Sequence, residues 1–76
     1  MPDQVLDTKG LNCPLPILKA KKEIAGMNSG QTLEVHSTDP GSVMDFEALC
    51  RQTGHKLLES SQENGVYIFL LEKSGA

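Results

Sequence analysis

The chain has few of the residues that large cores require. Of its 76 residues one is Tyr, two are Phe and none is Trp. A chain of this length buries only about 60% of the surface that its unfolded form exposes, so we expect one thin two-layer domain over residues 1–76. This excludes a large enclosed ligand cavity and places the functional groups at an exposed edge.

Positive charge is also scarce. Seven Lys and Arg stand against ten Asp and Glu, which gives a formal net charge of −3. This is the wrong sign for a protein that binds phosphate backbones, so we expect no direct contact with nucleic acid. The longest apolar run, Val66 to Leu71, is too short to span a bilayer, and the acidic N-terminus lacks an apolar signal segment. We therefore expect a cytoplasmic protein that does not enter a membrane.

Cysteine is limited to Cys13 and Cys50, too few for the disulfide framework of a small secreted domain. In a reducing compartment both remain thiols. Neither belongs to a C-x-x-C pair, and His36 and His55 do not form an H-x-x-x-H pair. These spacings predict no metal site. No resident cofactor is expected either.

Strand signals occur in four segments. Residues 32–37 alternate apolar Leu33 and Val35 with polar side chains, the pattern of a half-buried strand. Asn64 and Gly65 tolerate positive backbone angles and predict a hairpin turn. The expected strands are Gln4 to Thr8, Thr32 to Ser37, Lys56 to Ser61 and Val66 to Glu72.

Two amphipathic helices are predicted between these strands. From Leu15 to Met27 apolar residues recur at steps of three and four and define one buried face. The second helix begins at a cluster of Asp39, Pro40 and Ser42, in which short acceptor side chains cap free N–H groups. It ends near residue 53, before a glycine suited to a left-handed conformation.

The order βαβαββ defines the expected fold class. Two right-handed crossovers place both helices on the same face, giving a two-layer α/β sandwich of the α+β type with a mixed four-stranded sheet. The opposite face is then open to water. The last strand is apolar on both sides, which favours a central position in the sheet over an outer surface covered by a partner.

Cys13 lies in the stretch Gly10-Leu11-Asn12-Cys13-Pro14-Leu15-Pro16, between a loop and the first helix. If Cys13 is the N-cap, Pro14 and Pro16 occupy the first and third helical positions, where a missing N–H costs little. The free N–H of Leu15 and the positive end of the helix dipole then stabilise a thiolate and lower the pKa of Cys13. We expect a rigid, exposed nucleophile.

The residues around Cys13 also limit its chemistry. No His, Asp or Glu lies within the motif to act as a base, which argues against an acyl-transfer triad. Attack on a sulfane or disulfide sulfur needs only an available thiolate and a good leaving group. The motif therefore predicts that Cys13 carries sulfur as a persulfide.

The Cys-Pro-x-Pro motif at Cys13 to Pro16, which opens a helix after a strand in a short acidic chain, resembles the TusA/SirA/YedF family of sulfur carriers. The likeness covers nearly the whole chain and includes Leu6-Asp7, Gly10, Asp39-Pro40 and Asp45. It implies a sulfurtransferase whose Cys13 accepts sulfane sulfur from a cysteine desulfurase or a rhodanese-type donor. The acceptor is then a protein with a reactive cysteine.

The resemblance implies the βαβαββ sandwich and leaves three pathways open: tRNA thiolation, sulfur oxidation and molybdenum-cofactor synthesis. Asn12 stands where tRNA-thiolating members tend to carry Arg, and Leu15 where they tend to carry Glu. Both differences remove charge beside the sulfur and bear on partner recognition more than on the carrier chemistry. The run CPLPILK resembles members from sulfur-oxidising pathways at least as much.

Charged residues near the motif suggest partner contacts. Lys19 and Lys22 share the solvent side of the first helix, and Lys9 and Lys21 add charge at the same end. They form either an ordinary solvated face or a docking patch for an acidic partner. Asp45 either stabilises the first turn of its helix electrostatically or, as the resemblance suggests, contributes to function.

Two other functions compete with the carrier hypothesis. A non-catalytic interaction module would bind a partner through the open sheet face, which we expect around Tyr67 and Phe69. A thiol–disulfide protein would pair Cys13 with Cys50, which requires their α-carbons to lie within about 7 Å. Cys50, however, falls on the apolar stripe of the second helix, where free cysteine usually packs as a small hydrophobe.

Overall fold

The computed structural model describes residues 2–74, and the order of their elements is βαβαββ, as predicted. Three strands have the expected bounds, whereas the first helix ends earlier than expected and the third strand runs longer. Met1, Gly75 and Ala76 of the predicted domain lie outside the described residues. The elements are β1 (Gln4–Thr8), α1 (Leu15–Ala25), β2 (Thr32–Ser37), α2 (Ser42–Thr53), β3 (Lys56–Glu63) and β4 (Val66–Glu72).

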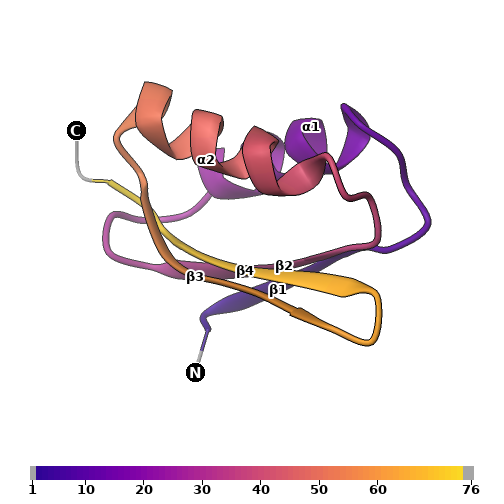
Figure 1. Ribbon diagram of the computed structural model, residues 1–76. Coiled ribbons are helices and arrows are strands. Elements are labelled where there is room, and N and C mark those ends of the chain that lie inside the picture. Colours follow the sequence, from indigo (N-terminus) through magenta and orange to yellow (C-terminus); the bar gives the residue numbers. More distant parts are fainter. Residues whose placement is uncertain (1, 75–76) are drawn as a thin grey trace.

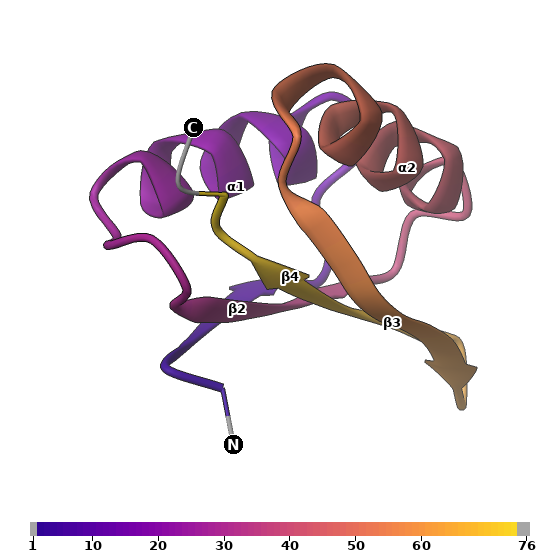
Figure 2. The same cartoon turned by 90° about the vertical axis from the view of Figure 1, so that its left-hand side faces the viewer.

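The strands form one mixed sheet in the order β1-β2-β4-β3. β1 is parallel to β2, and β4 is antiparallel to both of its neighbours. Both helices cover the same face of this sheet, so the molecule has two layers (Figures 1 and 2). The predicted fold class and the central position of β4 are confirmed.

The core lies between the helices and the covered sheet face. Phe46 of α2 stacks on Phe69 of β4, with ring centroids 4.6 Å apart and an interplanar angle of 24°. Stacked aromatic pairs add to the free energy gained from burial, and both rings are fully buried. The remaining core side chains come from both layers: Ala20, Ile24, Met27, Leu33, Val35, Leu49, Cys50 and Leu71.

One expectation about the open face is wrong. Phe69 is buried and Tyr67 packs against the core, so both side chains face the helices. Because side chains alternate along a strand, Ile68 and Leu70 are the β4 residues on the open face. β4 is apolar on both sides, as predicted, but Tyr67 and Phe69 lie on its covered face instead of its open face.

Two predicted turn positions have the expected backbone. Gly54, which follows α2, has a φ of 83°, and its N–H donates to the carbonyl of Cys50 at 2.9 Å. Asn64 and Gly65 of the β3–β4 hairpin have φ values of 52° and 80°. These positive values match a two-residue hairpin loop whose twist suits the flanking strands.

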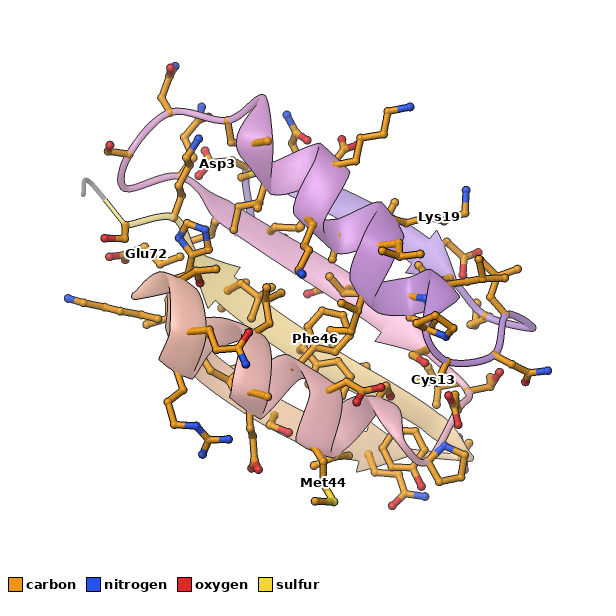
Figure 3. The ribbon with its side chains drawn as sticks, turned by 90° about the horizontal axis from the view of Figure 1, so that it is seen from above. Asp3, Cys13, Lys19, Met44, Phe46 and Glu72 are labelled. Atoms are coloured by element: carbon orange, nitrogen blue, oxygen red, sulfur yellow. The ribbon has the colours of Figure 1, made fainter. Side chains whose placement is uncertain are left out.

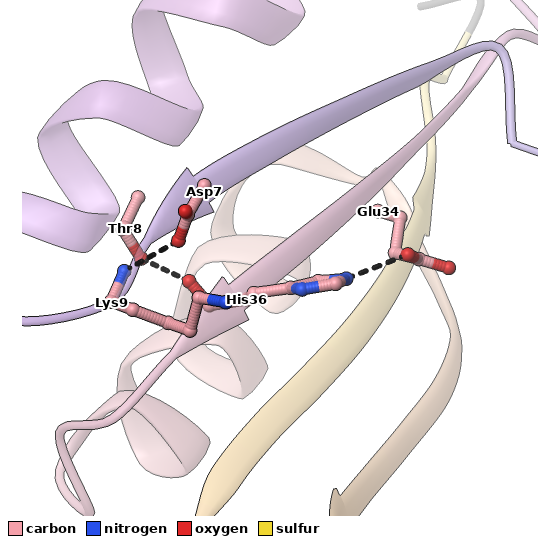
Figure 4. A network of polar contacts seen from close by, with 5 residues as sticks. All are labelled: Asp7, Thr8, Lys9, Glu34 and His36. Atoms are coloured by element: carbon pink, nitrogen blue, oxygen red, sulfur yellow. Dashed lines mark hydrogen bonds and ion pairs between the residues drawn. The ribbon is translucent and has the colours of Figure 1, made fainter.

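Side-chain hydrogen bonds fix the point at which the chain leaves β1 (Figure 4). The Thr8 hydroxyl donates to the carbonyl of His36 on β2 at 2.6 Å, and the Lys9 N–H donates to Asp7 at 2.9 Å. Gly10 follows with a φ of 85°, and its N–H donates to Thr38 at 3.0 Å. The loop that leads to Cys13 is therefore held to the end of β2.

We predict that replacing Phe46 by Leu lowers the free energy of unfolding by about 1–2 kcal/mol, because the stacked pair and part of the buried ring area are lost. Urea denaturation followed by circular dichroism measures this change. Met44, which is 76% exposed on the same helix, provides the control. Met44→Ala should change the free energy by less than about 0.5 kcal/mol. Equal effects of the two substitutions would contradict the assignment of the core.

Candidate functional site

Cys13 lies in the loop between β1 and α1 and is exposed. The helix begins at Leu15 with Pro14 as its N-cap, so Cys13 precedes the cap by one residue. The condition considered for the motif, that Cys13 is the N-cap, is therefore not met. Pro16 occupies the second helical position rather than the third, where its missing N–H again costs little because the first-turn donors have no partner within the helix.

The first donor of α1 does not stabilise a thiolate as expected. The Leu15 N–H donates to the carbonyl of Asn12 at 2.8 Å, closing a turn around Cys13. The carbonyl of Pro14 accepts the N–H of Leu18 at 3.0 Å, and the peptide bond between Cys13 and Pro14 is cis. The motif thus shapes the loop around the sulfur. The Leu15 N–H is not available to a thiolate, because it already donates to the Asn12 carbonyl.

Two carboxylates from the other half of the chain hold Cys13. Its Sγ donates a hydrogen bond to Oδ2 of Asp45, in the first turn of α2, at 2.8 Å. Its backbone N–H donates to Oδ2 of Asp39 at 2.7 Å, and the other oxygen of Asp39 accepts the Gly41 N–H. Asp39 therefore does not cap α2, which has Gly41 at the N-cap and no side-chain cap.

These contacts reverse the expected electrostatics of the thiol. The hydrogen bond to the Asp45 carboxylate raises the pKa of Cys13 above its ordinary value, and slight desolvation and the charges of Asp45 and Asp39 act in the same direction. A thiol that donates to a carboxylate is stabilised in its protonated form, because the thiolate would be repelled. The prediction of a lowered pKa is therefore wrong for the isolated chain.

A groove of about 180 Å³ extends from Cys13 between α1 and α2. Figure 3 shows Cys13 at one end of the space between the two helices, with Phe46 nearer the middle of that space. Four positions on each side line the groove: Cys13, Pro14, Ile17 and Lys21 from the motif and α1, and Asp45, Ala48, Leu49 and Gln52 from α2. The sulfur is thus accessible beside a mostly apolar surface.

The lysines of α1 point in different directions. Lys19 projects from the side of α1 that faces away from α2 (Figure 3). Lys22 is exposed and does not line the groove. Lys21, which the sequence analysis names only as additional charge, lines the groove together with Cys13. Spacing explains this, because Ile17 and Lys21 lie one turn apart and share the side of α1 that lines the groove.

Cys50 has a different environment. It is 8% exposed within the core, and burial raises the pKa of its thiol. It lies five residues beyond Asp45, about 7.5 Å along the helix axis, on the face that packs on the sheet. Both cysteines are free thiols. These positions favour core packing for Cys50 over a redox pair with Cys13.

The contact between Cys13 and Asp45 could not be found from local sequence, since the two residues are 32 positions apart. The sequence does carry a weak signal for the α2 side of the groove, because Asp45, Leu49 and Gln52 have the spacing of one helix face. In residues 2–74, no group of three or more His, Cys, Asp or Glu side chains is arranged to hold a metal ion. Neither helix in that range has the length and apolar character of a membrane span.

The fold and the site together define a small α+β protein that presents one accessible thiol before a helix. Comparison with known proteins identifies the class more closely. A family model described as sulfurtransferase TusA matches residues 4–73. The chain belongs to this family.

The relatives support the assignment. The sulfur carrier protein TusA of Allochromatium vinosum is 60% identical over 72 residues, which cover 95% of each chain. A putative sulfur carrier protein of Neisseria meningitidis serogroup A is 51% identical over 72 residues, covering 95% of this chain and 97% of the relative. A crystal structure of a SirA-like protein from Desulfitobacterium hafniense superposes with a TM-score of 0.83 at 23% identity, covering 93% of this chain and 97% of that one. It confirms the fold.

We predict that Asp45→Asn lowers the pKa of Cys13, because the main contact that favours the protonated thiol is removed. The measurement is the rate of iodoacetamide alkylation from pH 6 to 10, with the modified residue identified by peptide mapping. The midpoint of the profile should shift to lower pH, and alkylation near pH 7 should become faster. Glu47→Gln, an exposed substitution on α2 outside the groove, should leave the profile unchanged. An unchanged profile for Asp45→Asn would contradict the assigned contact.

Proposed function

We propose that this protein is a sulfur carrier that holds sulfane sulfur as a persulfide on Cys13 and relays it between proteins. The observation that carries the proposal is the exposed Cys13 thiol at the mouth of the groove between α1 and α2. Membership in the TusA family and the names of the relatives support sulfur transfer. The chain acts as a covalent relay and needs no cofactor of its own.

The chemistry consists of two exchanges at sulfur. In loading, the Cys13 thiolate attacks the outer sulfur of a persulfide on the donor, the bond between the two donor sulfurs breaks, and the donor cysteine leaves as a thiolate. In unloading, a thiolate of the acceptor attacks the outer sulfur on Cys13, and Cys13 leaves. Each exchange conserves electrons, so neither an oxidant nor a reductant is required.

The proposed partners are proteins. The donor is a cysteine desulfurase or a rhodanese-type protein, and the acceptor carries a reactive cysteine; the exchange takes place in the cytoplasm. Lys19 and Lys22 remain candidates for docking an acidic region of a partner, because both are exposed near the motif. They lie outside the groove, so they would contact the partner beyond the reacting cysteines.

The competing interaction-module hypothesis loses the surface on which it was based. Tyr67 packs against the core and Phe69 is fully buried, so neither can anchor a partner on the open face. The redox hypothesis is weakened by the burial of Cys50. The sulfur carrier is the function that uses the one thiol exposed beside a groove.

We predict that Cys13→Ser abolishes sulfur loading without changing the fold, because serine keeps the size of the side chain but cannot form a persulfide. The protein is incubated with a cysteine desulfurase, its cofactor and cysteine, and its intact mass is measured without reductant. The native protein should gain one sulfur, about 32 Da, which reductant removes. Circular dichroism checks the fold of the variant.

The matched control is Cys50→Ala, which removes the other sulfur. It should load like the native protein because Cys50 lies in the core and away from the groove. Loading of Cys13→Ser, or loss of loading in Cys50→Ala while its fold is intact, would overturn the proposal. A native protein that gains no sulfur from either a desulfurase or a rhodanese would overturn it as well.

A second prediction concerns docking. The double variant Lys19→Glu, Lys22→Glu should be loaded about two- to fivefold more slowly at low salt, because exposed charge pairs contribute modestly to association. The rate is obtained from the time course of the mass gain. Arg51→Glu with Lys56→Glu makes the same change of charge at exposed positions outside α1 and serves as control. Equal rates for the two double variants would remove Lys19 and Lys22 from the docking surface.

A further inference from the structure

Two carboxylates hold Cys13, and neither forms a salt bridge with a cation of residues 2–74. Asp45 accepts the hydrogen bond from Sγ at 2.8 Å, and Asp39 accepts the bond from the backbone N–H at 2.7 Å. The salt bridge within residues 2–74 joins Glu34 to His36 on β2, so it involves neither Asp39 nor Asp45. Asp45 therefore has the thiol as its hydrogen-bond partner and forms no salt bridge within this range.

This arrangement opposes both steps of sulfur transfer. Loading needs the Cys13 thiolate as the attacking group, and unloading needs it as the leaving group. Next to the Asp45 carboxylate the thiolate is repelled, whereas the protonated thiol is held by a hydrogen bond. In the isolated chain the neighbouring carboxylate therefore disfavours the thiolate that both steps require. A productive partner has to change the environment of Asp45.

The groove indicates what such a partner brings. Lys21 lines the same groove but forms no salt bridge with Asp45. The walls between them are apolar and include Ile17 and Leu49. A partner segment placed in this groove meets the sulfur and the Asp45 carboxylate at one end. The group that complements this end is a cation.

We propose that Asp45 acts as a charge lock on Cys13: its carboxylate holds the thiol in the protonated form until a basic side chain beside the partner's reactive cysteine pairs with Asp45. The inference rests on the proposed sulfur-carrier function and specifies the chemistry of its partners. A lysine or arginine that pairs with Asp45 takes the carboxylate away from the thiol, and the thiol proton passes to water. The resulting thiolate attacks the partner's sulfur, and the partner's leaving thiolate takes up a proton from water.

The test uses thiol–disulfide exchange, which does not depend on persulfide loading. The probes are two synthetic peptides, acetyl-Arg-Gly-Cys-Gly-Arg-amide and acetyl-Glu-Gly-Cys-Gly-Glu-amide, each a mixed disulfide with thionitrobenzoate. Attack of Cys13 on the peptide sulfur breaks the disulfide and releases the coloured thionitrobenzoate anion. The initial rate of absorbance increase at pH 7.5 is the readout.

Asp45→Asn and Glu47→Gln change the net charge equally, so they form a matched pair. The quantity compared is the ratio of the rate with the arginine peptide to the rate with the glutamate peptide. This ratio should be about two- to fivefold higher in the native protein and in Glu47→Gln than in Asp45→Asn. Asp45→Glu, which keeps the charge, should restore the preference. At about 1 M salt, where the Debye length falls to about 3 Å, the preference should shrink.

Two results would overturn the proposal. Equal rates for both peptides with the native protein would show that a cation does not open the site. An equal preference in Asp45→Asn and Glu47→Gln would assign the effect to net charge instead of Asp45. Either result leaves the carrier function intact if Cys13 still gains sulfur from a donor. Conversely, a charge preference without sulfur loading would support the lock and overturn the carrier.

Discussion

The direction of two neighbouring strands determines where the site forms. β1 and β2 are parallel, so their carboxyl ends lie at the same edge of the sheet, and the loops that lead to α1 and α2 begin there. Both helices must then cross the same face to bury their apolar stripes. Their first turns meet at this edge, which brings Asp45 of α2 to the thiol of Cys13 before α1.

Packing of the two layers positions the residues at this meeting point. The stacked rings of Phe46 and Phe69 join α2 to the central strand β4, and Phe46 directly follows Asp45 in the chain. A core side chain thus holds the backbone that carries the carboxylate. On the other side, the turn closed by Asn12 and Leu15 holds the cysteine. The site needs no large cavity, in keeping with a chain that has only three aromatic residues.

On the proposal that Cys13 carries the sulfur, its surroundings meet two opposing chemical requirements. The cysteine must react with selected proteins, yet it must not exchange with other thiols between encounters. Exposure at a groove mouth serves the first requirement, whereas the hydrogen bond from Sγ to Asp45 serves the second, because it stabilises the protonated thiol. Reactivity then depends on what a partner brings to the groove.

The sequence by itself determined the order of the elements, the fold class and the place of an exposed cysteine before the first helix. These features depend on local spacing: apolar residues three and four positions apart in helices, alternation in strands, and a cysteine that precedes Pro14 and Pro16. The sequence could not assign the faces of β4, since a strand apolar on both sides has no pattern that distinguishes them. Nor could it determine the pKa of Cys13. That property depends on Asp45, which is 32 residues away in the chain and reaches the sulfur only when both helices pack on one sheet.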